Sequence, residues 1–252
     1  ESAGVAVADA SGLRAHTGMG LVPEVFSSRL LRDLAGPDVR GGIGHNRYST
    51  AGGSLACNAQ PILENFVGGQ VALAHNGNLT NAAALRRFYE EAGHIFHTQS
   101  DTEVFVHLLA SPRQQKSADP VAATLRRVQG AFSVLFLFND RIEAARDPHG
   151  WRPLVLGRTE NGKPVVASET VALDAIGAKF VREVQPGEIV TLSDEGVSSR
   201  RFAEPAERKA HCAFEHVYFA SPSSVVFGQT VQLVRERLGE QQHPRQPRPG
   251  KV

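Results

Sequence analysis

Residues 41–50 read Gly41-Gly42-Ile43-Gly44-His45-Asn46-Arg47-Tyr48-Ser49-Thr50, and the glycine-rich run Ala51-Gly52-Gly53-Ser54 follows. The first part predicts a strand that ends at Arg47, and the glycines predict a loop with few backbone restrictions. A guanidinium matches a carboxylate bidentately, so Arg47 is a candidate for binding the α-carboxylate of an amino acid. Taken alone, the stretch fits a surface arginine beside a turn better.

The composition argues against several classes of protein. With 252 residues, 41% hydrophobic and 21% charged, the chain is long enough for one large domain or two small ones. The 27 Lys and Arg against 26 Asp and Glu leave a formal charge of +1, which gives no overall field for nucleic acid or a membrane surface. No apolar run reaches the length of a membrane span, and residues 1–20 lack a signal-peptide pattern. We expect neither nucleic acid nor membrane as a partner.

The chain has two cysteines, Cys57 and Cys212. Two cysteines are too few for a disulfide framework and fit a reducing compartment, although one bridge between them stays open. We therefore expect a cytoplasmic protein.

Helical periodicity appears in four segments. Apolar spacing predicts one helix over about residues 23–34 and a second whose apolar face carries Leu85, Phe88 and Tyr89. Ser100 and Glu103 have the spacing of a capping box, which predicts a helix directly after them. A fourth helix is expected to begin at residues 119–120 and to stop at residue 130.

Short strands separated by turns account for much of the remaining chain. They are predicted at residues 5–8, 13–17, 71–75, 132–138, 141–145, 154–157, 165–168, 180–184, 189–192 and 197–201. Strands and helices without regular βαβ alternation predict an α+β fold, in which helices cover mostly antiparallel sheets.

Three polar segments lie where a strand is predicted to end or a helix to begin. An α-amino acid requires a cation for its carboxylate, which Arg47 offers, and an anion for its ammonium group, which Asp101 offers. The amide of Asn76 and the backbone N–H of Gly77 suit an oxyanion that forms on a side-chain carbonyl. Singly, Asn76-Gly77 fits a tight turn and Asp101 a helix first-turn acid, but the joint pattern favours one amino-acid ligand.

Longer motifs in the chain resemble a known family. They are His45 to Thr50, Ala74 to Asn81, Ser100 to Glu103, Arg146 to Leu154, Ser168 to Asp174, Pro186 to Val190 and Cys212 to Ala220. Over about residues 1–240 they resemble the glutaminase domain of the amidophosphoribosyltransferases, glutamine amidotransferases with an N-terminal nucleophile.

The resemblance implies a fold and a function. The fold would be an αββα sandwich of two antiparallel sheets between helical layers. The activity would be hydrolysis of glutamine to supply ammonia for phosphoribosylamine synthesis from phosphoribosyl pyrophosphate, the first step of de novo purine biosynthesis. Arg47 would bind the glutamine carboxylate, Asp101 its amino group, and Asn76 with Gly77 the oxyanion.

The resemblance also implies a mobile element and a set of boundaries. Tyr48, Ser49 and Thr50 would begin a loop that closes over glutamine. Residues 1–220 would be a type 2 glutamine amidotransferase domain without its first strand, residues 221–240 the start of a linker to a phosphoribosyltransferase domain, and residues 241–252 a disordered tail. Residues 220–224 depart from the family's Ala-Arg-Pro-Asp-Ser, which puts this junction in doubt.

The family's nucleophile is an N-terminal cysteine whose own α-amino group serves as general base. Here residue 1 is Glu1, and Cys57 fits a small filler better than a nucleophile. We therefore expect no glutaminase activity from this chain by itself. A non-catalytic glutamine-binding or regulatory module, and a structural or assembly domain, remain as alternatives.

Cys212 matches a position that ligates an iron–sulfur cluster in one branch of the family, but one thiol cannot hold a cluster. We therefore expect no cofactor within this chain. The full-length family implies Mg²⁺, in one branch the cluster, phosphoribosyl pyrophosphate bound by the other domain, and a homo-oligomer.

Overall fold

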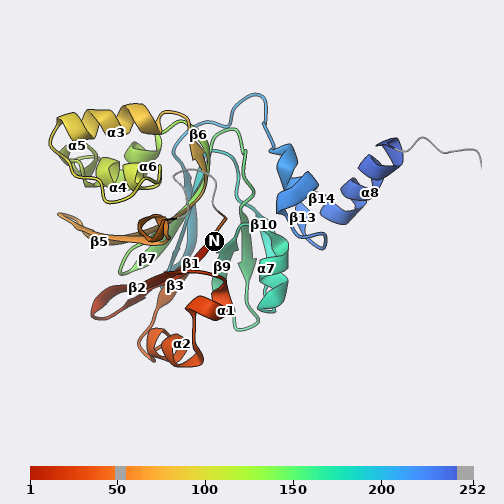
Figure 1. Cartoon of the computed structure of the whole chain (residues 1–252), viewed down its shortest axis with the longest axis horizontal. Helices are drawn as coiled ribbons and strands as arrows, with labels where there is room; N and C mark the ends of the chain where they lie inside the picture. Colours follow the sequence, from red (N-terminus) through yellow and green to blue (C-terminus); the bar gives the residue numbers. More distant parts are fainter. Residues whose placement is uncertain (49–54, 243–252) are drawn as a thin grey trace, which may run out of the picture.

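The computed structural model describes residues 1–48 and 55–242, and two antiparallel sheets form its centre (Figure 1). The smaller sheet has the order β2-β1-β3 and consists of β1 (Ser2–Asp9), β2 (Gly12–Met19) and β3 (Gly41–Arg47). The larger has the order β12-β11-β7-β6-β5-β4, and its strands are β4 (Ile62–Phe66), β5 (Gly69–Leu79), β6 (Gly130–Leu137), β7 (Arg141–Arg146), β11 (Glu188–Ser193) and β12 (Gly196–Arg201). The predicted α+β class with antiparallel sheets is confirmed.

The two sheets pack on each other through a mixture of small and larger apolar side chains, the larger ones including Leu13, Ile43 and Leu137. Ala6 and Ala8 of β1 belong to one buried cluster with Ala72 and Ala74 of β5. Since side chains alternate along a strand, the neighbouring residues of β1 point the other way. On that opposite face, Ala3 and Val7 belong to a second buried cluster. Side chains of α1 (Val22–Val25) and α2 (Ser28–Leu34) pack against them in this cluster. The helices thus cover the outer face of the small sheet.

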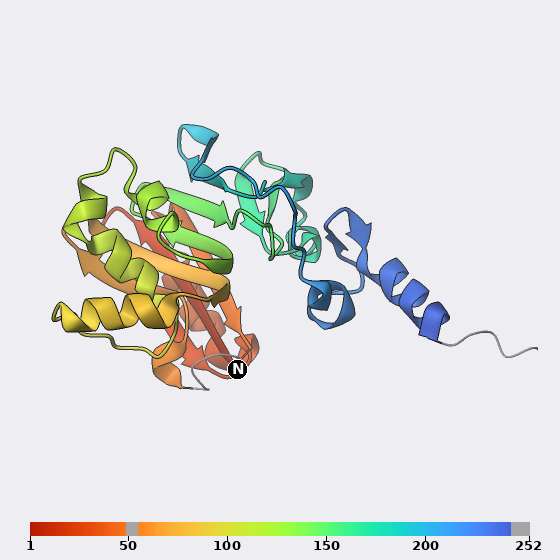
Figure 2. The same cartoon turned by 90° about the horizontal axis from the view of Figure 1, so that it is seen from above.

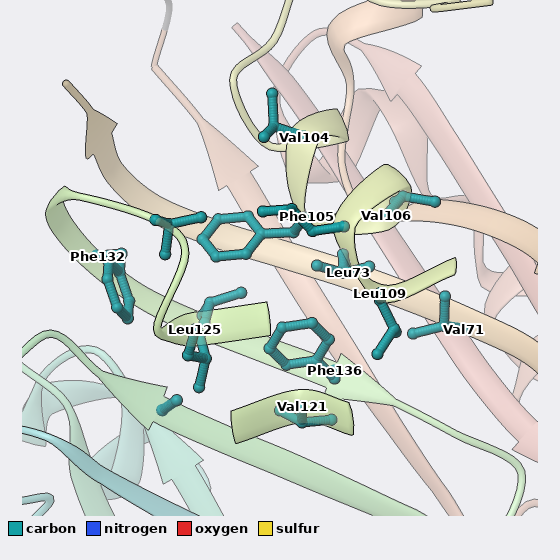
Figure 3. Close-up of a cluster of buried hydrophobic side chains, with 14 of the residues drawn as sticks. Val71, Leu73, Val104, Phe105, Val106, Leu109, Val121, Leu125, Phe132 and Phe136 are labelled. Carbon is teal, nitrogen blue, oxygen red and sulfur yellow. The ribbon is translucent and has the colours of Figure 1, made fainter. Parts of the chain in front are cut away.

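The outer face of the large sheet is covered by α3 (Ala82–Glu91), α4 (Glu103–Ala110), α5 (Pro112–Gln115) and α6 (Pro120–Leu125) (Figure 1). Figure 3 shows the side chains that lie between this sheet and the helices. On the sheet they include Leu73 of β5 and Phe136 of β6, and on the helices Phe105 and Leu109 of α4 and Leu125 of α6. All five are at most 1% exposed. The strand β5 is therefore buried on both faces, which fixes the position of its carboxyl end.

A third sheet, β10-β8-β9, follows in the chain. It contains β8 (Val155–Arg158), β9 (Pro164–Ala167) and β10 (Lys179–Glu183), and α7 (Thr170–Ala175) packs against it. The chain then forms a π-helical turn, η2 (Glu215–Phe219), the ribbon β13 (Val225–Val226) with β14 (Gln229–Thr230), and α8 (Val231–Gln242). Figure 2 shows this last part extending away from the two central sheets.

The predicted helix over residues 23–34 is wrong in one respect, because two short helices replace it. Phe26 has an extended backbone and is buried against the small sheet. The Oγ of Ser27 then accepts a hydrogen bond from the N–H of Leu30 at 3.2 Å and so caps α2. Burial of one aromatic ring and a new N-cap outweigh the continuity of the helix.

Two further details differ from the predictions. The predicted capping box between Ser100 and Glu103 is wrong, because neither side chain bonds to the backbone N–H of the other residue. The Oγ of Ser100 accepts from the N–H of Thr102, and the Glu103 carboxylate accepts from the N–H groups of His97 and Thr98. The helix nevertheless begins at Glu103. Phe88 is 60% exposed and does not belong to the buried face of α3.

The C-terminal boundaries stay predictions. Helix α8 extends to Gln242, two residues into the tail predicted to be disordered, and residues 243–252 lie outside the described part of the chain. Within residues 1–48 and 55–242, no helix combines the length and apolar character that crossing a membrane would demand.

Candidate functional site

Five of the residues selected from the sequence line one large cavity. Arg47, Tyr48, Asn76, Gly77 and Asp101 all line a cavity of about 1870 Å³. These residues line it from the end of β3, the carboxyl half of β5 and the segment before α4, and residues of β7, β8, β9 and β11 line other parts of it. Tyr48 is 63% exposed. The two remaining loop candidates, residues 49 and 50, lie outside the described residues.

The interpretation of Asn76-Gly77 as a tight turn is wrong. Strand β5 continues to Leu79, and Asn76 and Gly77 pair with Ser133 and Phe132 of β6. Gly77 has a φ of +153°, and a Cβ there would lie 2.0 Å from the carbonyl oxygen of Ala131. The same Cβ would lie 2.8 Å from Nε2 of His75. Only glycine fits this position, and the residue is exposed at the cavity.

A buried hydrogen-bond network joins β5 to the segment before α4. The Oγ1 of Thr102 accepts from Nε2 of Gln60 at 3.1 Å and from Oγ of Ser100 at 3.0 Å. It also lies 3.2 Å from Nδ1 of His75, whose backbone N–H donates to Oε1 of Gln60 at 2.7 Å. All four residues are at most 4% exposed. Since buried polar groups are costly unless they are paired, this network holds residues 100–102 in one place.

Asp101 is positioned by that network. Its Oδ2 accepts a hydrogen bond from the N–H of Leu79 at 2.8 Å, and its Oδ1 lies 3.7 Å from Nδ1 of His75. Burial raises the pKa of the Asp101 carboxyl, but the His75 ring and the Leu79 N–H outweigh it and hold the pKa below the ordinary 3.8. Asp101 is therefore a carboxylate at neutral pH, as binding of an ammonium group requires.

His45 connects β3 to β5. Its Nε2 lies 3.1 Å from the carbonyl oxygen of His75, and its Nδ1 lies 3.2 Å from that of Asn46. Burial lowers the pKa of His45 from 6.5 to about 4, and the charges of His75 and Arg47 add to this shift. His45 is thus neutral at pH 7, and Arg47 contributes positive potential at this end of β3.

Sequence reasoning missed a residue that contacts Asn76. The Nε and Nη2 of Arg152 donate to Oδ1 of Asn76 at 3.1 and 2.6 Å. Arg152 lines the same cavity. It belongs to the motif Arg146 to Leu154, which was noted only for its resemblance, and no local pattern assigns this arginine a contact 76 residues away.

The described residues do not fit a metal or an iron–sulfur cluster. Cys212 lines the cavity, and both Cys57 and Cys212 are free thiols. Within residues 1–48 and 55–242, no group of three or more His, Cys, Asp or Glu is placed to hold a metal ion. Iron–sulfur clusters require several ligands, so Cys212 alone does not form a cluster site.

Comparison with known proteins gives consistent matches. A family described as the glutamine amidotransferase domain matches residues 45–175. Amidophosphoribosyltransferase 2, chloroplastic, of Arabidopsis thaliana is 46% identical over 241 residues, which are 95% of this chain and 42% of that protein. A solved structure of the allosteric regulatory enzyme of purine biosynthesis matches with a TM-score of 0.86 and 39% identity, over 98% of this chain and 53% of the other. The structure of glutamine phosphoribosylpyrophosphate amidotransferase of B. subtilis, complexed with ADP and GMP, matches with a TM-score of 0.82 and 39% identity, over 95% of this chain and 51% of the other. The chain spans about half the length of these relatives.

The close contacts of Gly77 predict the effect of a single methyl group. Gly77→Ala should lower the free energy of unfolding by ~1–3 kcal/mol, the usual cost of overpacking, with urea denaturation as the measurement. Gly69→Ala is the matched control, because Gly69 lies in the same strand with a φ of +114° and has nothing within 4 Å of its added Cβ. Equal losses in both variants would show that backbone strain, not collision, determines the effect.

The low pKa of His45 predicts a loss of stability in mild acid. His45 has its ordinary pKa of 6.5 in the unfolded chain and a pKa of about 4 in the folded one. Between pH 6.5 and pH 4 the unfolded state therefore binds one more proton than the folded state. The stability contribution of neutral His45 is therefore complete above pH 6.5 and falls as the pH approaches 4. Urea denaturation between pH 7 and pH 4.5 should show this decrease, and His45→Gln should make it shallower. An unchanged slope in His45→Gln would contradict the prediction.

Proposed function

We propose a function for this chain, which belongs to the glutamine amidotransferase domain family in the class II form found in amidophosphoribosyltransferases. The proposal is that the cavity binds L-glutamine. One observation carries it: a guanidinium, an ionised carboxylate and a pair of amide donors line the same cavity from three separate segments.

Each group of glutamine has a partner of suitable chemistry. The guanidinium of Arg47 would bind the α-carboxylate bidentately, and the carboxylate of Asp101 would bind the α-ammonium group. The side-chain carbonyl would then face Nδ2 of Asn76 and the N–H of Gly77. Arg152 supports this orientation, because its two N–H groups engage Oδ1 of Asn76 and leave the Nδ2 end for another acceptor.

The same two donors explain how the domain would assist hydrolysis. When a nucleophile attacks the side-chain carbonyl, negative charge develops on its oxygen, and preorganised donors stabilise that charge more than they stabilise glutamine itself. Loss of one such donor typically costs ~10²–10³ in rate. The exposed Tyr48 lines the cavity and would, with Ser49 and Thr50, cover bound glutamine.

Residues 1–252 would by themselves bind glutamine without hydrolysing it. The nucleophile of this chemistry is a thiol with its own α-amine as base, and the two thiols of the chain, Cys57 and Cys212, are internal residues without an α-amine. We therefore assign these residues the binding and the oxyanion stabilisation only.

For the whole protein the proposal extends to purine biosynthesis. Ammonia from glutamine would pass to phosphoribosyl pyrophosphate and give phosphoribosylamine, in a cytoplasmic homo-oligomer that uses Mg²⁺ in its other domain. The chloroplast location in the name of the Arabidopsis relative belongs to that protein. We also propose that the layers of helices and sheets form the αββα sandwich of N-terminal-nucleophile hydrolases.

Calorimetry with L-glutamine tests the binding proposal. The chain should bind glutamine, and Arg47→Met and Asp101→Asn should each weaken binding ~10–100-fold, the cost of a lost hydrogen bond to a charged group. Arg29→Met and Asp33→Asn are matched controls, because this exposed pair on α2 does not line the cavity. No glutamate should be released in any sample. Absence of binding by the unaltered chain, or equal binding by the site variants, would overturn the proposal.

A further inference from the structure

We infer that Arg152 is a positioning residue: it fixes the orientation of the Asn76 amide and links that amide to the C-terminal segment η2. The inference rests on the proposed function only in giving Asn76 its role as oxyanion donor. The contacts that carry it are independent of any ligand.

The contact with Asn76 selects one end of an amide. An asparagine side chain can turn end for end, which exchanges a donor for an acceptor at nearly the same place. Two N–H groups of Arg152 meet Oδ1 of Asn76 at 3.1 and 2.6 Å, and the exchanged orientation would put donors against donors. Arg152 therefore makes Nδ2 the end of the amide that is available to a ligand.

The backbone of Arg152 is held by buried groups. Its carbonyl oxygen accepts from Nε of Arg146 at 2.8 Å, and Arg146 is 1% exposed. Asp147, which is fully buried, accepts from the N–H groups of His149 and Trp151 and so shapes the turn that leads to Arg152. The guanidinium thus extends from a rigid loop, and its position is not set by Asn76 alone.

The other side of the Arg152 guanidinium contacts η2. Its Nη1 lies 2.8 Å from Oε1 of Glu215, and these side chains are 16% and 5% exposed. The guanidinium carbon also lies 4.8 Å from the ring centre of Phe219. Because a buried carboxylate that loses its partner is costly, Arg152 and Glu215 are expected to move together. Displacement of η2 would therefore change the contact between Arg152 and Asn76.

The segment after η2 is bound to the start of α7. Oε2 of Glu169 accepts from the N–H of Ser221 at 2.8 Å and from Oγ of Ser224 at 2.6 Å. The N–H of Val225 donates to Oγ1 of Thr170 at 2.9 Å. The segment that follows η2 is thus held against α7 by specific hydrogen bonds.

Nuclear magnetic resonance of the side-chain Nδ2 group of Asn76 tests the inference without glutamine. Arg152→Lys keeps the charge but offers a single point donor in place of the planar fork, and Glu215→Gln keeps the shape of its side chain but removes its charge. Both should shift the Asn76 Nδ2 resonances and speed exchange of their protons with water. The resonances are assigned by their loss in Asn76→Ser.

Arg182→Lys is the matched control, because Arg182 forms a similar pair with Glu188 at 2.8 Å and does not line the cavity. It should leave the Asn76 resonances in place, even where it lowers the melting temperature as much as Arg152→Lys does. Unchanged Asn76 resonances in Arg152→Lys, or equal shifts in Arg182→Lys, would overturn the positioning role. Unchanged resonances in Glu215→Gln would overturn the link to η2. If Arg152→Lys does not fold, the Asn76 resonances of Glu215→Gln alone decide whether the inference stands. A failure to bind glutamine would bear on the proposed function and not on this result.

Discussion

The site depends on one buried group of hydrogen bonds around the hydroxyl of Thr102. Gln60, His75 and Ser100 surround this hydroxyl, and together they join the end of β5 to the segment that carries Asp101. In a low-dielectric interior such bonds are strong, and breaking one leaves a costly unpaired group. Because β5 is packed on both faces, the network transfers the rigidity of the core to a carboxylate at the cavity wall.

The fold was largely predictable from local patterns, and the exceptions have identifiable physical causes. Local patterns located most of the strands but not β4, and the end of β3 at Arg47 was predicted from the quoted stretch. Asn76-Gly77 was misread because this pair favours turns locally, whereas pairing with β6 keeps it in a strand. The break of the helix at Phe26 was in principle readable, since Ser27 is a favourable N-cap residue.

The sequence drew attention to residues that line the cavity, but not to the contacts that support them. Arg47 and Asp101 were selected because an amino acid needs opposite charges at fixed places, and both line the cavity, while their roles toward glutamine stay predictions. Arg152 was not, because its partners Asn76 and Glu215 are distant in sequence and no spacing rule joins them. A close approach such as that of Gly77 to the Ala131 carbonyl likewise exists only after the strands have paired.

A crystal structure of the chain with L-glutamine would test the central claim most directly. We expect the α-carboxylate to lie against Arg47, the ammonium group against Asp101, and the side-chain carbonyl oxygen within hydrogen-bond distance of Nδ2 of Asn76 and N–H of Gly77. Glutamine bound away from these groups, or reversed so that its side-chain amide meets Arg47, would contradict it.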